Sequence, residues 1–425
     1  MMSIFNKADD ISRRGFVEGM AAAALGMNFV PAYSAEKALA KGTAEHVIFL
    51  YMSGGMSHID TLDTKPDNKS VQGPVKSIKT SADGIRISEY LPNLAKQMHH
   101  ATIFNSLTTS QGAHAQGNYY MHTSYQPRGT IKHPHMGAWM SYFLGKKNAT
   151  LPCNVKISSG SKSLGAGFMD PKHGALPIGD PKAGLQNSKL PNGVTDKAMS
   201  KRLEMAAKMN AEFQNKYNQT KVKAYSDMYK DAIKLMNSKD LAAFDITKER
   251  KSALEAYGDN KFGNGCLLAR RLVEHGVRFV EVGLGGWDTH DKNFERVPEN
   301  SETLDKALGA LIADLHSRGL LKKTLVVLTT EFGRTPKIVP GKNGRNHYPK
   351  AFSALMAGGG IKGGFVYGKT DKNGAEIVKD KVKVPDFNAT IAKAVGIDVN
   401  KKIFSKSGRP FNVSKKGKPI NDVFA

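Results

Sequence analysis

The chain has 425 residues and a formal net charge of +24 at pH 7, because 62 lysines and arginines oppose 38 aspartates and glutamates. A chain of this length can bury a large hydrophobic core in one elaborated domain or in two. The only cysteines are Cys153 and Cys266. Zinc-finger spacing is therefore absent, and the sequence leaves open whether the two form a disulfide or remain two buried thiols.

The N-terminus has the features of an export signal. Arg13 and Arg14 precede a modestly apolar segment, residues 19–30, and small residues follow as far as Ala35. Paired arginines, a weakly hydrophobic core and a small-residue cleavage point are typical of twin-arginine signals. We therefore predict a signal peptide over residues 1–34, recognition by the twin-arginine translocation machinery, and a periplasmic or secreted mature protein. The apolar segment is too short to span a membrane, and we expect no membrane span in the mature protein.

The positive charge belongs to the mature protein. The predicted signal holds three basic and three acidic residues, so its removal takes away none of the excess. A field of this sign favours anionic partners, such as a phosphorylated or sulfated small molecule or an acidic polysaccharide. The lysines are spread along the chain and no nucleic-acid-binding motif is present, so we expect no specific nucleic-acid partner.

Two predicted strands in the first part of the mature chain are followed by polar side chains. Residues 45–52 read as a strand that leads into two glycines, and His58 and Asp60 come next. Glycine permits a close approach of the backbone to a ligand. Residues 101–104 form a second short apolar run, which leads into a hydroxyl-rich stretch, residues 105–110, that we interpret as a loop.

A predicted helix over residues 114–125 carries a polar stripe. His114, Asn118 and His122 recur at a spacing of four residues, which places them on one face of the helix. Such a stripe faces a functional site, or else it consists of ordinary structural or surface side chains.

Two further strand ends carry the most informative residues of the chain. Residues 277–283 read as a buried strand that runs into a glycine-rich loop with Asp288 and His290. Residues 325–330 read as another buried strand, which ends at Glu331. Carboxylates and imidazoles are the side chains that transition metals use most often as ligands.

A predicted helix over residues 301–318 connects these two strands. Strand, helix and strand form the crossover that joins parallel strands, so both polar clusters should lie at one edge of a sheet, where open α/β sheets bind ligands. Arg334, Arg345 and His347 follow on a loop rich in glycine. A buried strand followed by a solvated loop is the alternative, but two clusters at one edge favour a site.

Several common site motifs are absent. The GKT at residues 368–370 is not followed by a predicted helix, and no GxGxxG stands between a predicted strand and a helix. The sequence also lacks the GxSxG turn of serine hydrolases. Classical nucleotide binding and the serine-hydrolase fold are therefore poor interpretations.

Seven segments of the sequence carry a family resemblance: SRRGF, GGMSHIDTLDTKP, HPHMGAW, GGWDTH, TEFGRTP, GRNHYP and AFSALMAGGGIKGGFVYGKTD. Together they resemble the exported bacterial proteins catalogued as domain of unknown function 1501, across essentially the whole mature chain. That family is grouped with the alkaline-phosphatase and sulfatase superfamily. The resemblance implies an α/β fold of alkaline-phosphatase-like type, with a doubly wound, mostly parallel sheet and a metal site at the strand ends. Residues 35–425 would form this domain, and the strongly helical residues 196–257 would be an inserted subdomain.

The resemblance also implies roles for single residues. Asp288 and His290 resemble the Asp and His that superfamily enzymes place on one metal. Glu331 stands where those enzymes have a strand-end Asp, and Phe332 stands where they have the following His. His347 resembles their late metal-binding histidine.

Some positions depart from the superfamily pattern. Ser53 stands where relatives have a metal-binding Asp after the first strand, and only His58 or Asp60 would compensate. Asn346 stands where relatives usually show Asp. The hydroxyls in the region of the family nucleophile are those of Ser106, Thr108 and Thr109. No sulfatase-type Cys-x-Pro-x-Arg surrounds them, which argues against formylglycine chemistry.

Two functions from different classes follow from these observations. The first is an exported metal-dependent hydrolase of phosphate or sulfate esters. The second is a secreted binding or structural protein that keeps the fold, lacks catalysis and attaches to anionic polymer.

For the hydrolase, we expect the side chains of four residues to converge on one or two divalent cations: Asp288, His290, Glu331 and His347. At least one of His58, Asp60 and His114 should complete the pocket. Arg334 or Arg345 would hold the anionic group through paired hydrogen bonds, and a hydroxyl or water would attack. Mixed nitrogen and oxygen ligands suit zinc or manganese, whereas calcium would require that oxygens dominate.

The first testable prediction concerns export. Replacing Arg13 and Arg14 by Lys should leave the precursor in the cytoplasm, because twin-arginine recognition depends on the guanidinium pair. Cell fractionation and immunoblotting measure this, and N-terminal sequencing of the wild-type protein should find a mature terminus near Ala35. Normal periplasmic accumulation of the double variant would refute the signal.

Overall fold

The computed structural model describes residues 42–157, 165–186, 188, 193–216, 227 and 230–425. The predicted signal peptide, residues 1–34, lies outside the described residues. None of the helices in the described part of the chain is long and apolar enough to cross a membrane.

The described residues are built around one nine-stranded sheet. In spatial order its strands are β12 (Phe365–Tyr367), β4 (Ala101–Thr108), β11 (Phe352–Ala357), β8 (Thr324–Thr329), β1 (His46–Met52), β7 (Phe279–Leu284), β5 (Asn154–Ile157) and β6 (Leu176–Ile178), and β15 (Val382–Lys383) pairs with β4. Paired strands are parallel, except that β11 runs antiparallel to both β4 and β8.

The central strands are buried on both faces. Every residue of β1 and of β8 is buried, as expected for apolar runs in a parallel sheet that is covered on both sides. Alternate residues of β1 point to opposite faces: Ile48 and Leu50 belong to one hydrophobic cluster, and Phe49 and Tyr51 to the other.

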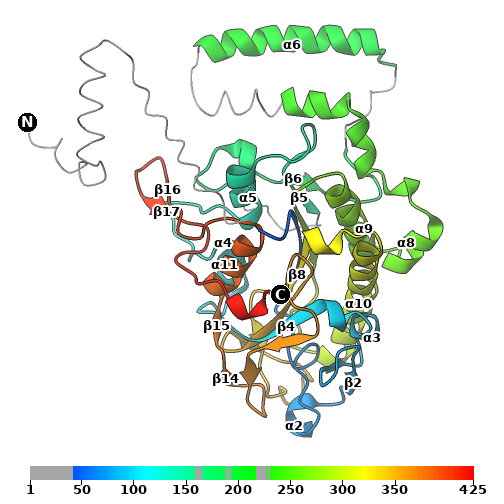
Figure 1. Cartoon of the computed structure of the whole chain (residues 1–425), viewed down its shortest axis with the longest axis vertical. Helices are drawn as coiled ribbons and strands as arrows, with labels where there is room; N and C mark the ends of the chain where they lie inside the picture. The colour runs from blue at the N-terminus through cyan, green and yellow to red at the C-terminus, as the bar shows by residue number, and fades with distance from the viewer. Residues whose placement is uncertain (1–41, 158–164, 187, 189–192, 217–226, 228–229) are drawn as a thin grey trace, which may run out of the picture. The chain divides into compact units, whose positions relative to one another are not determined.

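Helices cover both faces of this sheet (Figure 1). On one face, residues of α3 (Pro92–Ala95), α9 (Lys261–Glu274) and α10 (Asn293–Ser317) join the first hydrophobic cluster. On the other, residues of α4 (His114–Thr123), α5 (Met136–Leu144) and α11 (Val384–Ala394) join the second. The expected α/β class, a doubly wound and mostly parallel sheet, is confirmed.

Shorter elements connect these layers. The small strands are β2 (Ser77–Lys79), β3 (Arg86–Ser88), β9 (Gly333–Arg334), β10 (His347–Tyr348), β13 (Lys369–Thr370), β14 (Ile377–Lys379), β16 (Ile403–Phe404) and β17 (Pro410–Phe411). The remaining helices are α2 (Lys69–Gln72), α6 (Asp196–Lys216), α8 (Lys251–Tyr257) and the 3-10 turns η2 (Met98–His100), η3 (Pro171–His173), η4 (Lys239–Phe244), η5 (Ile246–Lys248), η6 (Leu321–Lys323) and η7 (Asn421–Val423). The segment interpreted as a helical insertion thus contains α6, η4, η5 and α8, and most of residues 217–229 lie outside the described residues.

The interpretation of residues 105–110 as a loop is wrong for residues 105–108. Strand β4 continues through Thr108, because its polar side chains find partners inside the fold. The Ser106 hydroxyl donates to the carbonyl of Asp380 at 2.6 Å, and Asn105 Oδ1 accepts from the Ser353 hydroxyl at 2.7 Å. Satisfied hydroxyls and amides are tolerated in a buried strand.

Of the two alternatives for the cysteines, a disulfide or two buried thiols, the structure shows the thiols. Cys153 and Cys266 are both free and buried, and burial raises the pKa of both. Buried thiols of raised pKa are poor nucleophiles and poor metal ligands.

Candidate metal centre

The centre lies at the edge of the sheet where β1, β7 and β8 end. Met52 is in register with Leu284 of β7, and Tyr51 with Thr329 of β8, so the three strands finish side by side. The loops with Asp288 and with Glu331 therefore leave the same edge, as the sequence predicts.

Three imidazoles surround the Asp288 carboxylate. His114 Nε2 lies 3.3 Å from Asp288 Oδ2, and His290 Nε2 and His347 Nε2 lie 3.2 and 3.4 Å from Oδ1. The Nε2 atoms of His290 and His347 are 3.0 Å apart. Ligand atoms bound to one zinc at roughly 2.0–2.2 Å lie about 3.3 Å from one another, so these separations fit a shared cation. His114, Asp288 and His347 form a group whose ligand atoms all lie within 4.8 Å of one another.

Each imidazole is held by its other nitrogen. His114 Nδ1 lies 2.8 Å from Glu331 Oε1, His347 Nδ1 lies 2.8 Å from the carbonyl of Gly112, and His290 Nδ1 lies 2.9 Å from Asn346 Oδ1. An acceptor at Nδ1 requires that nitrogen to carry the proton, which leaves a lone pair on Nε2 of a neutral ring. Metal-binding histidines are oriented in the same way by partners behind the ring.

The Nε2 atoms of the three rings converge beside the Asp288 carboxylate, which Arg334 contacts through Oδ1. The lone pairs of His290 and His347 point at each other and at a carboxylate, and His114 Nε2 is buried without a hydrogen-bond partner. Acceptors facing one another repel unless a proton or a cation lies between them. The donor set therefore fits a divalent cation.

The centre is open to solvent on one side. The Asp288 side chain is 46% exposed and that of His347 is 23% exposed, so a substrate can reach both. The Phe332 side chain is fully buried, and its ring centroid lies 5.0 Å from that of His114 and 4.6 Å from that of His347. An apolar ring thus borders the centre at the position where the resemblance to superfamily enzymes implies a histidine.

The charges of the centre favour an ionised Asp288. Burial alone would raise the pKa of its carboxyl, but the hydrogen bond and charge of Arg334, together with His114 and His290, lower the pKa to about 2. The hydrogen bond to Glu331 raises the pKa of His114, whereas burial lowers the pKa of His347. A carboxylate that stays ionised is available as a ligand across the neutral pH range.

Glu331 lies behind His114 and not beside Asp288. Its Oε1 accepts from His114 Nδ1 and, at 2.9 Å, from the backbone N–H of Gly54; its Oε2 accepts from the Tyr51 hydroxyl at 2.9 Å and from that of Thr330 at 3.1 Å. The side chain is 1% exposed. Four donors occupy this carboxylate, so the structure corrects its expected role from a direct ligand to the residue that orients His114.

Glycines allow the loops to approach one another. A Cβ at Gly54, whose φ is +120°, would lie 2.4 Å from the backbone nitrogen of Asp288. A Cβ at Gly344 would lie 1.8 Å from the carbonyl oxygen of His290. Side chains at either position would push apart the segments that carry Asp288, His290 and His347.

The two expected anion-binding arginines are structural. Arg345 is fully buried, and it pairs with both oxygens of Asp60 at 2.8 and 2.9 Å. Its remaining N–H groups donate to the carbonyls of Thr335, Pro336 and Val71, so no donor is left for a substrate.

Arg334 is also fully buried and donates to the carbonyls of Gly54, Gly55 and Arg345 as well as to Asp288 Oδ1 at 2.5 Å. Arg334 therefore stabilises the Asp288 carboxylate from the protein interior. Its guanidinium group does not reach solvent, where it could form paired hydrogen bonds to an anion.

The other expected site residues lie elsewhere. Asp60 is fully buried and accepts three hydrogen bonds, two from Arg345 and one from Asn293 Nδ2 at 2.9 Å, and it does not belong to the group of ligand atoms at this centre. His58 is fully buried, its Nε2 lies 2.8 Å from the carbonyl of Gly374, and burial lowers its pKa. Of the three candidates to complete the pocket, only His114 joins the centre.

The hydroxyl candidates are committed to other partners. Ser106 donates to Asp380, Thr108 Oγ1 donates to the carbonyl of Pro349 at 3.2 Å, and Thr109 Oγ1 accepts from the backbone of Gln111 at 3.2 Å. In the described part of the chain, no hydrogen bond joins these hydroxyls to Asp288 or to the three imidazoles.

The sequence matches the family described as "Protein of unknown function (DUF1501)" over residues 44–424. The chain belongs to this family. No curated protein matches it.

Several solved structures resemble the fold. A sulfatase from Pseudoalteromonas sp. is 13% identical, with a TM-score of 0.43 and coverage of 96% of this chain and 74% of the sulfatase. A protein in the alkaline phosphatase superfamily from Vibrio parahaemolyticus is 12% identical, with a TM-score of 0.37 and coverage of 84% and 68%. A phosphonate monoester hydrolase from Silicibacter pomeroyi is 11% identical, with a TM-score of 0.39 and coverage of 89% and 76%. Their activities do not define that of this family member.

The second prediction separates a structural Asp60 from a metal ligand. Asp60→Asn should lower the free energy of unfolding by about 3–5 kcal/mol, because it leaves the buried Arg345 guanidinium without its counter-charge. Metal content per folded molecule should not change. Urea unfolding and elemental analysis measure the two quantities, and Asp67→Asn, at an exposed carboxylate nearby, is the control. Loss of metal at unchanged stability would restore Asp60 as a ligand.

The third prediction concerns Glu331. Glu331→Gln should weaken metal binding by about 10–100-fold, as for other partners that orient a ligating histidine, because an amide cannot accept from His114 and Tyr51 as a carboxylate does. Competition with a chromogenic chelator measures the dissociation constant. Tyr51→Phe removes a donor from the far oxygen only and should have a smaller effect. A loss as complete as that of His347→Ala would instead support direct ligation by Glu331.

Proposed function

We propose that the protein is an exported, metal-dependent hydrolase of phosphate or sulfate esters. The observation that carries the proposal is the convergence of three Nε2 lone pairs on the Asp288 carboxylate, each ring being fixed from behind. Metal-ligating histidines are oriented by acceptors behind the ring in this way.

The residues that would hold the cation are His114, Asp288, His290 and His347. Three nitrogens and one carboxylate suit zinc or manganese, and they suit calcium poorly because calcium takes oxygen ligands. When bound, a divalent cation supplies Lewis-acid polarisation of an ester oxygen and makes water more acidic.

Three other side chains would orient the ligands and shield the centre. Glu331 keeps His114 in its tautomer, Arg334 keeps Asp288 ionised and in place, and Phe332 excludes water from one side of the centre. Because the hydroxyls of Ser106, Thr108 and Thr109 are engaged elsewhere, water is the attacking group in this proposal. The charge of +24 supports an anionic ester as substrate, since it raises the local concentration of anions.

The fourth prediction is that the purified mature protein contains stoichiometric zinc or manganese. Asp288→Asn and His347→Ala should each remove it, because each loses a ligand. Elemental analysis of dialysed protein measures the content. His275→Ala, at the exposed histidine that caps the C-terminus of α9, is the control and should bind metal as the wild type does.

The same variants test catalysis on p-nitrophenyl phosphate, bis(p-nitrophenyl) phosphate and p-nitrophenyl sulfate. Hydrolysis of at least one ester should fall by more than about 100-fold in the ligand variants and should remain in His275→Ala. Folded wild-type protein without metal would overturn the proposal. Metal without hydrolysis of these esters would favour the other function, a secreted protein that binds anionic polymer.

A further inference from the structure

The polar stripe on α4 continues beyond the metal centre. His114, Asn118 and His122 occupy successive turns of one helix face, and each meets a polar side chain of the sheet. His114 meets Glu331, Asn118 faces the Tyr51 hydroxyl, and His122 meets Glu281 of β7. We call these three contacts the α4 seam.

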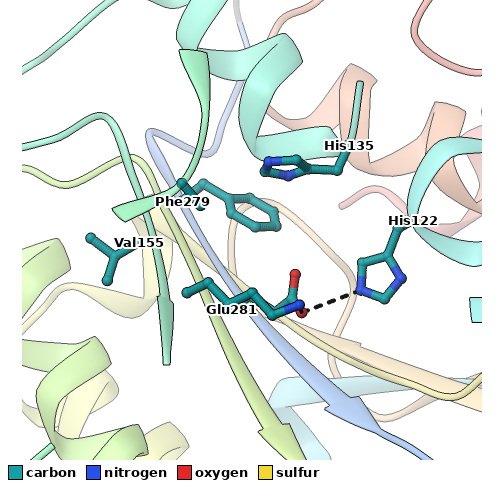
Figure 2. A pocket seen from close by; sticks show the side chains of 7 residues that line it. His122, His135, Val155, Phe279 and Glu281 are labelled. Carbon is teal, nitrogen blue, oxygen red and sulfur yellow. Dashed lines mark ion pairs between the residues drawn. The ribbon is translucent and has the colours of Figure 1, made fainter. Parts of the chain in front are cut away.

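The far end of the seam is a buried charge cluster (Figure 2). The His122 ring is directed at Glu281, with Nε2 3.4 Å from Oε1, and the ammonium of Lys156 lies 2.9 Å from the same oxygen. The three side chains are no more than 10% exposed. His122 Nδ1 lies 2.8 Å from the carbonyl of Asn118. Both ring nitrogens thus lie within 3.4 Å of oxygen atoms.

This cluster is not a second metal site. The space beside it measures about 10 Å³, which is close to the minimum for one water. The remaining histidine of the pocket, His135, accepts from the Gly137 backbone N–H through Nδ1 at 3.1 Å. Its neutral ring therefore carries the proton on Nε2, where it cannot ligate a metal.

Helix α4 depends on these contacts for its position. It begins after Ala113 without a side-chain cap, and Gly117 in its interior lowers its intrinsic stability. Its last turn is held by Glu281 and by Asn388, whose Nδ2 donates to the Met121 carbonyl at 2.7 Å. A shift of one residue along the helix would rotate its face by about 100° and break all three contacts of the seam.

We propose that Glu281 is a positioning residue for the metal centre. Glu281 holds His122 at one end of α4 and so fixes the rotation of the helix about its axis and its position along that axis. The position of His114 Nε2 at the other end of the helix follows from both. Tyr51 links the two ends, because its ring centroid lies 4.5 Å from that of His122 and its hydroxyl donates to Glu331. The role in metal binding rests on the proposed function, whereas the effect on His114 does not.

The fifth prediction uses the double variant Glu281→Gln/Lys156→Met. Glu281→Gln alone would leave the Lys156 ammonium buried and unpaired, which is destabilising; the double variant removes both charges and isolates the contact with His122. In metal-free protein with ¹³Cε1-labelled histidine, the His114 resonance should shift or broaden. The cobalt(II) dissociation constant should rise about 10-fold, with a changed d–d spectrum.

Asp305→Asn is the matched control. Asp305 is a buried carboxylate on α10, at the opposite face of the sheet, where it accepts from the backbone N–H groups of Asn93 and Leu94 at 2.9 and 2.7 Å. Its loss should lower stability and leave the His114 resonance and the cobalt spectrum unchanged.

The outcomes separate the two proposals. An unchanged His114 resonance in the double variant would overturn the role of Glu281, whatever the protein does with metal. A shifted His114 resonance in a wild-type background that takes up no cobalt would support the positioning role and refute the metal centre.

Discussion

The buried carboxylate of Glu331 is the interaction on which the site depends. An ionised carboxylate with 1% exposure is tolerated only when its lone pairs are satisfied. Its four donors come from the end of β1, the turn after β1, the first residue of α4 and its own strand end. The carboxylate therefore ties together three segments that are distant in sequence, and the orientation of His114 follows from that arrangement.

Much of this edge is predictable from the sequence, for a simple physical reason. Runs such as residues 325–330 are too apolar to lie outside a buried sheet, and the glycines and charged residues after them can only lie where the sheet ends. Since parallel strands end at one edge, the meeting of Asp288, His290 and His347 follows from their places in the chain. His114 follows from helical spacing combined with the same argument.

The pairing of buried charges is not predictable in this way. Spacing shows that Asp60, Glu331, Arg334 and Arg345 lie near the strand ends, but it does not show which of them turn inward. Three of the four have fully buried side chains with internal partners and Glu331 is 1% exposed, so charged residues that resemble ligands in the sequence serve as scaffold. The hydroxyls of β4 were misread for a related reason, because Ser106 resembles a loop residue until its partner at Asp380 is known. The signal in the sequence is Phe332, an apolar residue at the position where superfamily enzymes have a histidine.

The order of the ligands along the chain has a consequence for biosynthesis. His114 leaves the ribosome early, whereas His347 emerges after six of the nine strands of the sheet have been made, and β11, which separates β8 from β4, emerges later still. No nascent chain that ends before His347 contains the complete ligand set. Uptake of the proposed cation by the full ligand set would therefore follow the synthesis of at least the first 347 residues.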